Sequence, residues 1–227
     1  MDRKKIFWAI ITILISAAIL VVITDMIFKL NNINEGKFRV ADSIITSTVE
    51  LTYKNDADEE KKTWTFDVSQ NNILSLIIAN RTNMKIKDIY IENIKVISGG
   101  DIYIEQIEYE SSHKIEGKNE KINIYSETRE DGSEIIEFNI NNKNIIKNYN
   151  VPSDVKEIRH DGTILNIAGV KLSDIEFKFK ASLIVVEENG SKNICKISLK
   201  MPKEELITNG QIVERLSLEN FSFKVSD

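Results

Sequence analysis

The sequence has little cysteine, proline or glycine, and these shortages bound the class of protein. Cys195 is the single cysteine, so the chain forms no internal disulfide and its stability must come from packing. Only two prolines and nine glycines occur, whereas 42% of the residues are hydrophobic and 29% are charged. This composition is typical of a globular chain that buries a core. The net charge of -5 argues against nucleic acid or an anionic membrane surface as a partner.

Sequence motifs for common chemistry are also missing. The chain has no glycine-rich phosphate loop, no HExxH, no GxSxG and no EF-hand spacing. Nucleotide chemistry, zinc proteolysis, esterase activity and a loop-type calcium site therefore lack support, and we expect no cofactor. Glycoside hydrolysis stays open, because it needs only two carboxylates that the fold brings together.

One long apolar segment stands near the start of the chain. Residues 6–24 (IFWAIITILISAAILVVIT) carry no charge and follow the basic cluster Arg3-Lys4-Lys5. At ~1.5 Å per residue, an α-helix of this length spans about 28 Å, close to the ~30 Å hydrocarbon core of a bilayer. The segment predicts a transmembrane helix, and the basic cluster predicts a cytoplasmic N-terminus with the rest of the chain outside.

A cleaved signal peptide is the main alternative to this anchor. Ser16-Ala17-Ala18 has the small-x-small form that a signal peptidase accepts. The apolar run exceeds the ~7–15 residues usual for such a peptide, so we favour a retained anchor. The predicted organisation is a cytoplasmic stub (1–5), a transmembrane helix (6–24), a tether (25–37) and an extracytoplasmic region (38–227), with 141–162 as the place where two modules would divide.

The extracytoplasmic region shows the period-two alternation of β-strands. Apolar and polar residues alternate over 177–185, and Asn189-Gly190 predicts a tight hairpin to a second strand that buries Cys195. Gly99-Gly100 and Asp131-Gly132 predict two further hairpins. Additional strands are expected at 44–53, 64–68, 73–79, 163–167 and 212–225.

This pattern predicts an all-β fold, an antiparallel β-sandwich of the immunoglobulin-like or jelly-roll-like kind. The apolar positions change face at Glu92-Asn93 and at Glu219-Asn220, which indicates a β-bulge or a strand corner at each pair. Proline at 202 and Gly210 bracket one short predicted helix. The stretch 74–96 is similar in style to bacterial immunoglobulin-like and surface-fibre β domains, a resemblance that assigns no functional residue.

Two sets of side chains are candidates for function. Asp154, Glu157 and Asp161 would share a face, with His160 beside them, if Ser153 caps a helical turn. Such a cluster could bind a divalent cation or act in acid/base catalysis. Ordinary surface acids beside a capped turn are the competing interpretation, and we favour it. Tyr90 and Tyr103 could face each other across the hairpin at Gly99 and pack together or contact a partner.

The sequence as a whole indicates a membrane-anchored protein of the cell envelope. Because no catalytic set converges, we expect a non-enzymatic interaction or structural component with a protein partner in the envelope or a second copy of itself. The exposed edges of its sheets are expected to take part, since unpaired backbone groups there can accept another strand. The alternative is a membrane-tethered hydrolase that acts on envelope glycans through a carboxylate pair.

Overall fold

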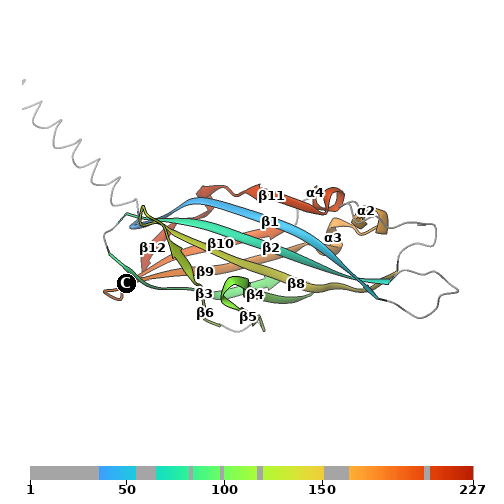
Figure 1. Cartoon of the computed structure of the whole chain (residues 1–227), viewed down its shortest axis with the longest axis horizontal. Helices are drawn as coiled ribbons and strands as arrows, with labels where there is room; N and C mark the ends of the chain where they lie inside the picture. The colour runs from blue at the N-terminus through green and yellow to red at the C-terminus, as the bar shows by residue number, and fades with distance from the viewer. Residues whose placement is uncertain are drawn as a thin grey trace, which may run out of the picture. The chain divides into compact units, whose positions relative to one another are not determined.

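A computed structural model gives the fold, and it describes residues 36–54, 65–81, 84–97, 100–116, 120–150, 164–201 and 205–226. Lys37–Asp227 form one compact unit. The described residues are mostly β-strand and lie in two antiparallel sheets, as a β-sandwich requires (Figure 1). The predicted transmembrane segment, 6–24, lies outside them. In the ranges that the structure describes, no helix has the length and apolar character needed to cross a membrane.

The larger sheet has seven strands in the order β11-β1-β2-β8-β4-β5, with β7 also paired to β8. Its strands are β1 (Phe38–Lys54), β2 (Thr65–Asn80), β4 (Asp101–Gln106), β5 (Ser111–Lys114), β7 (Ser126–Thr128), β8 (Glu134–Asn150) and β11 (Gln211–Arg215). The smaller sheet has the order β12-β10-β9-β3-β6. Its strands are β3 (Ile86–Ile97), β6 (Ile122–Asn123), β9 (Phe177–Glu187), β10 (Lys192–Met201) and β12 (Phe223–Ser226).

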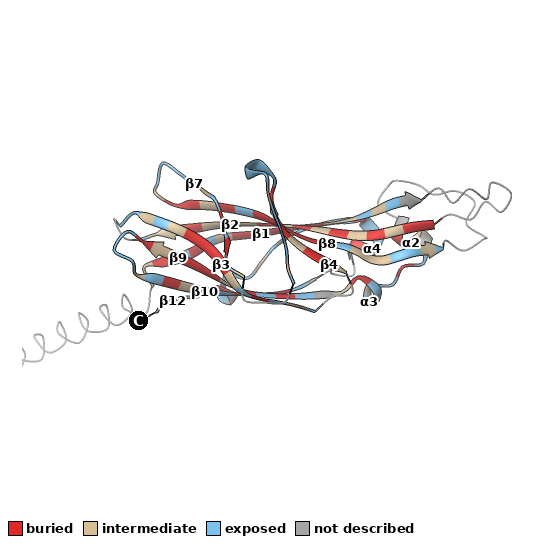
Figure 2. Ribbon diagram, turned by 90° about the horizontal axis from the view of Figure 1, so that it is seen from below, coloured by how far each residue is buried: buried red, intermediate tan, exposed pale blue. Residues whose placement is uncertain are grey.

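Alternation along each strand places one row of apolar side chains between the two sheets. Leu74, Leu76 and Ile78 of β2 face Ile91 of β3 and Leu183 of β9 in the main core, and all are fully buried. Figure 2 shows this as buried positions that alternate with intermediate or exposed ones along the ribbons of both layers. The sandwich is therefore held by apolar burial on the inner faces.

A second core lies at the first residues of β2, under three short helices. These helices are α2 (Ile164–Ala168), α3 (Leu172–Ile175) and α4 (Glu205–Asn209). Leu165, Ile175 and Leu206 from the helices pack against Phe66 and Val68 of β2. The three helices gather at one end of the larger sheet (Figure 1).

Between the two cores, the inner face of the larger sheet carries a belt of polar side chains. Ser47, Gln70, Asn72 and Asn142 are all buried, and we name them the polar belt. The hydroxyl of Ser47 donates to Asn72 Oδ1 at 2.7 Å, the amide of Gln70 donates to the same oxygen at 3.1 Å, and Asn72 Nδ2 donates to the Ile140 carbonyl at 3.1 Å. The belt keeps β2 extended across a polar stretch, so the predicted strands 64–68 and 73–79 form one strand.

Two of the three predicted hairpins are confirmed. At Asn189-Gly190, β9 turns directly into β10, and Gly190 has a φ of 87°. At Asp131-Gly132, β7 turns into β8 with Gly132 at φ 77°, and the Arg129 amide donates to the Ser133 carbonyl at 2.8 Å. Both turns need positive φ, which glycine adopts without steric cost.

The hairpin predicted at Gly99-Gly100 is wrong. β3 pairs with β9 in the smaller sheet, whereas β4 pairs with β8 in the larger one, so the chain crosses between sheets here. The alternation of apolar and polar residues before and after Gly99-Gly100 fits a crossing between sheets as well as a hairpin, because a strand buries one face in either sheet. Glycine is required at position 100 because the backbone there packs closely against β8. A Cβ at this position would overlap the Asn142 amide and lie 2.6 Å from the Lys143 carbonyl oxygen.

Two further strand predictions need correction. Within the strand predicted at 163–167, the described residues 164–167 belong to helix α2, which buries Leu165 in the second core and is followed by Gly169 at φ 76°. The predicted strand 212–225 is divided into β11 and β12, which lie in different sheets and are joined through the 3₁₀ turn Leu218–Asn220. That turn is the corner predicted at Glu219-Asn220, and the bulge predicted at Glu92-Asn93 is confirmed, with Asn93 at φ 54°. The predicted short helix is present as α4.

Candidate functional site

The predicted cluster of Asp154, Glu157, His160 and Asp161 lies outside the described residues, and its convergence remains a prediction. Among the side chains that the structure does describe, no three of His, Cys, Asp or Glu are grouped so that they could hold a metal ion. Residues 141–150 of the predicted module division are part of β8.

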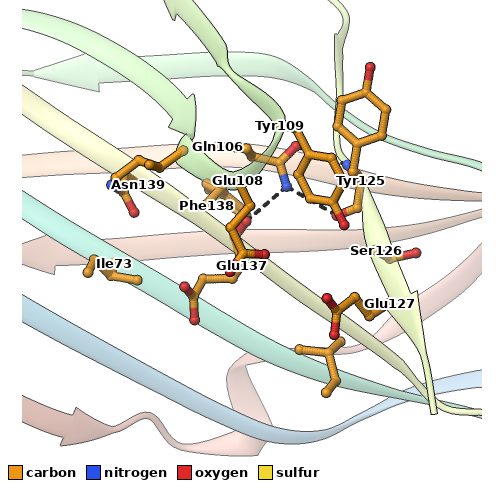
Figure 3. Close-up of a pocket in the computed structure, with 12 residues that line it drawn as sticks. Ile73, Gln106, Glu108, Tyr109, Tyr125, Ser126, Glu127, Glu137, Phe138 and Asn139 are labelled. Carbon is orange, nitrogen blue, oxygen red and sulfur yellow. Dashed lines mark hydrogen bonds between the residues drawn. The ribbon is translucent and has the colours of Figure 1, made fainter.

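A hollow of about 220 Å³ opens on the outer face of the larger sheet (Figure 3). Its floor comes from β2 and β8, and its rim comes from the 3₁₀ turn Ile107–Tyr109 and from the start of β7. The lining residues are Ile73, Gln106, Ile107, Glu108, Tyr109, Tyr125, Ser126, Glu127, Ile135, Glu137, Phe138 and Asn139. We name this the tyrosine–glutamate hollow.

Gln106, at the end of β4, holds the two sides of the rim together. Its side chain is buried, and its amide nitrogen donates to the carbonyl oxygens of Tyr125 at 3.1 Å and Glu137 at 2.9 Å (Figure 3). Its amide oxygen accepts a hydrogen bond from the Tyr125 amide at 2.9 Å. Three hydrogen bonds from one buried side chain fix the segment before β7 over β8.

Two tyrosines form the exposed part of the rim. The rings of Tyr109 and Tyr125 stack with their centroids 4.5 Å apart and their planes at 20°. Tyr109 is 40% exposed, Tyr125 is 51% exposed and the neighbouring Ile107 is 73% exposed. Aromatic side chains presented to solvent on a fixed backbone lose little conformational entropy on binding, and they are enriched at interfaces.

The hollow is acidic. Glu108, Glu127 and Glu137 line it and are exposed, and none of the lining residues is a lysine or an arginine. A fourth carboxylate, Glu134, is buried and accepts hydrogen bonds from the hydroxyls of Ser126 at 2.7 Å and Thr128 at 2.9 Å, which fastens β7 to β8. Carboxylates beside stacked rings favour a cationic group, through charge-assisted hydrogen bonds and cation–π attraction.

Apolar side chains continue from the hollow across the outer face of the larger sheet. In register, Val213 of β11 lies opposite Thr46 of β1, Thr46 lies opposite Ile73 of β2, and Ile77 of β2 lies opposite Ile135 of β8. Val213 is exposed, and the other four positions, Thr46, Ile73, Ile77 and Ile135, are half-buried. An outer sheet face that carries apolar residues next to a hollow is typical of a contact surface for another macromolecule.

Comparison of the chain with family models, with curated proteins and with solved structures found no match.

The predicted pairing of Tyr90 with Tyr103 is wrong, because their strands lie in different sheets. Tyr90 is buried on the smaller sheet with the Lys121 ammonium 4.0 Å from its ring centroid, and Tyr103 lies on the larger sheet with Lys143 at 4.5 Å. The prediction for Cys195 is confirmed: the side chain is buried in the main core, and burial raises the pKa of its thiol to about 12. Such a thiol is not a nucleophile at neutral pH.

The hollow was not predicted from sequence. Its one signal is Gln106, which follows the buried Ile102 and Ile104 at the same two-residue spacing and so places an amide where an apolar side chain is expected. A polar residue in an apolar row must find buried hydrogen-bond partners. Those partners lie 19 and 31 residues further along the chain, too far for local reasoning to identify.

Proposed function

We propose that this protein is a membrane-anchored, extracytoplasmic interaction component of the cell envelope, without enzymatic activity, and that the tyrosine–glutamate hollow is its contact site for a protein partner. The observation that carries the proposal is the exposed Tyr109–Tyr125 stack above three exposed glutamates. The anchor at 6–24 and the outward orientation are supported by the apolar run and the basic cluster before it.

The chemistry of the hollow specifies the kind of partner segment. A lysine or arginine side chain suits it best, because the apolar stem can lie against the rings while the cationic head reaches a carboxylate. The hollow is small, about 220 Å³, and therefore fits one or two side chains of a larger interface. The apolar outer face that continues toward Val213 would supply further contact area.

We also propose the finer description of the fold as an immunoglobulin-like or jelly-roll-like sandwich. Passage of the chain from one sheet to the other between β3 and β4 and between β11 and β12 supports it. Such crossings are a property of both architectures.

Site-specific photo-crosslinking in living cells tests the contact site. A photoreactive amino acid at Ile107 should crosslink to a partner protein, and the same probe at the exposed Asn166 of α2 is the matched control. Replacing Tyr109 and Tyr125 by alanine should strongly reduce the Ile107 product and leave expression unchanged. Equal products from both probe positions, or none from Ile107, would refute the contact site.

Protease accessibility tests the proposed location separately. Protease added to intact cells, or to cells stripped of any outer barrier, should degrade the carboxyl-terminal region. Protection in both preparations, with degradation only after lysis of the inner membrane, would contradict the outward orientation.

A membrane-tethered glycan hydrolase is the second candidate, and the specific observation in its favour is that Glu108, Glu127 and Glu137 line a single hollow. Glycoside hydrolysis uses two such carboxylates, about 5–10 Å apart. Incubation of the purified chain with envelope polysaccharide would then release reducing ends, and Glu137→Gln would stop the release. Absence of any release by the unmodified chain rejects this candidate and leaves the interaction proposal in place.

A further inference from the structure

The outer face of the smaller sheet is a second charged surface, and its charge is opposite to that of the hollow. Exposed lysines are numerous there, and five of them form a group on three neighbouring strands, with Lys192 further along β10: Lys95 of β3, Lys178 and Lys180 of β9, and Lys196 and Lys200 of β10. We name this set the lysine face.

The register brings these lysines together in rows across the strands. Lys95 lies directly opposite Lys180, and Lys178 lies directly opposite Lys200. Directly opposed residues in an antiparallel pair have Cβ atoms ~4.5–5.5 Å apart, and like charges at that spacing are destabilising. The ammonium groups of Lys95 and Lys180, and those of Lys178 and Lys200, therefore repel each other across neighbouring strands.

Few carboxylates compensate this charge. Lys200 forms an ion pair with Glu176 at 2.9 Å. Among the ion pairs of the described residues, none involves Lys95, Lys178, Lys180 or Lys196. The whole chain has a net charge of -5, so a positive patch of this kind is a local concentration and not a consequence of overall composition.

We propose that the lysine face of one copy docks onto the tyrosine–glutamate hollow of a second copy. The inference rests on the proposed function, in which the hollow is a contact site for a protein with basic side chains, and it identifies that protein as the chain itself. The charges are complementary: several lysines of one face have no ion-pair partner among the described residues, and three carboxylates line a hollow in which no described lining residue is a lysine or an arginine.

Apolar contact supports the same pairing. Ile97 is 73% exposed and lies directly opposite Lys178, within the lysine face. Ile107 is equally exposed at the rim of the hollow. An anionic polymer would neutralise the lysines but would leave both isoleucines and the tyrosine stack in water, whereas a second copy covers them. The occupant of the hollow is therefore the lysine face of a second copy.

The position of the two surfaces determines the kind of assembly. The hollow is on the outer face of the larger sheet and the lysine face is on the outer face of the smaller one, so each copy keeps one surface available after the other is used. Contacts of this heterologous type repeat from copy to copy and produce a row instead of a closed dimer. Copies anchored in one membrane would form such a row laterally.

Sedimentation of the full chain in detergent tests the proposal. The unmodified chain should show a concentration-dependent series of oligomers that dissociates in about 1 M salt, where the Debye length is ~3 Å. The variant K178E/K180E should be monomeric, with association weakened about tenfold or more, because like charges then face each other. The variant K85E/K147E, which makes the same change in net charge at exposed lysines outside both surfaces, should associate like the unmodified chain.

A charge exchange gives the decisive result. The variant E127K/E137K should not associate alone, but an equimolar mixture with K178E/K180E should associate again. The unmodified lysine face of one variant then meets the unmodified hollow of the other, and the two reversed surfaces are complementary as well. Circular dichroism confirms that each variant is folded. Monomers of the unmodified chain at all concentrations, or equal loss of association in K85E/K147E, would overturn the proposal. So would a mixture that stays monomeric although both variants are folded.

The outcomes separate this inference from the proposed function. If the Ile107 probe crosslinks to a different protein and K178E/K180E leaves that product unchanged, the contact site is retained and self-association is rejected. If the lysine face binds soluble polyanions while the unmodified chain stays monomeric, the occupant is an anionic polymer and the inference is likewise rejected.

Discussion

Lys37, the residue before β1, forms an ion pair with the buried Glu187. We predict that loss of the lysine destabilises the fold more than loss of the glutamate. The Glu187 side chain is 0% exposed, and its oxygens accept hydrogen bonds from the Lys37 ammonium at 2.9 and 3.1 Å and from Asn193 Nδ2 at 2.9 Å. The Lys37 side chain is 39% exposed. The two charges are thus unequally dependent on each other: Lys37 can be hydrated without its partner, and Glu187 cannot.

The pKa of Glu187 reflects the same balance. Burial acts to raise it, and the hydrogen bonds from Lys37 and Asn193, with the positive charge of Lys37, together bring it below the ordinary value of 4.5. Without Lys37, only the hydrogen bonds from Asn193 and Asn189 would oppose the effect of burial on this pKa. Lys37→Met should therefore destabilise the fold by about 2–3 kcal/mol at neutral pH, at or just below the ~3–5 kcal/mol for breaking a fully buried pair, because Lys37 is partly solvated. Glu187→Gln should cost about 1 kcal/mol, since Lys37 then turns to water.

The pH dependence has a definite sign. Because the folded-state pKa of Glu187 is lowered, its contribution is fully present above 4.5 and is lost as the pH falls through the folded-state value. The difference between the unmodified chain and Lys37→Met should thus be largest at neutral pH and shrink in acid. Urea titration followed by circular dichroism at several pH values measures it. A larger loss in Glu187→Gln than in Lys37→Met, or a difference that grows in acid, would refute the reasoning.

Three further predictions concern packing and the buried thiol, and the same urea titration checks the first two. Gly100→Ala should destabilise by more than ~2 kcal/mol, because the added Cβ overlaps Asn142 and approaches the Lys143 carbonyl; Gly132→Ala, where nothing lies within 4 Å, should cost only the ~1–2 kcal/mol of positive φ. Asn142→Leu should be neutral or stabilising, by up to ~2 kcal/mol, because neither atom of the buried Asn142 amide has a partner among the described residues; a loss above that amount would show that the amide is satisfied, for instance by water. Cys195 should resist alkylation until urea unfolds the chain, since burial holds its pKa at about 12; rapid labelling of the folded protein would contradict its placement.

Turn residues and the alternation of apolar residues predicted most strands and two hairpins correctly. They failed to predict which of the two sheets a strand joins, because a strand can bury its apolar face equally well in either. Asn189-Gly190 and Asp131-Gly132 identified hairpins because the backbone there needs positive φ. Gly99-Gly100 has the same appearance in sequence, yet the glycine at 100 serves close packing against Asn142. Assignment of a strand to a sheet depends on contacts between residues far apart in the chain, which periodicity does not contain.

The candidate site was harder to predict than the fold for a related reason. Tyr109 and Tyr125 are separated in sequence by two short strands, and their stack exists only because Gln106 joins both segments. Acidic residues are numerous in the chain, so composition could not single out the three that share a hollow. The cluster identified from local spacing, around His160, lies outside the described residues and stays a prediction.

The polar belt bears on how reliably the long strands find their correct alignment. Outside the belt, β1, β2 and β8 present mostly apolar side chains at alternate positions, so a slide of two residues would still bury much of the same apolar surface. Only one alignment lets Asn72 meet both Ser47 and the Ile140 carbonyl. A shifted pairing would leave these buried amides without their hydrogen-bond partners, so the polar belt disfavours mispaired strands during folding. A core made of apolar side chains alone would impose no such penalty.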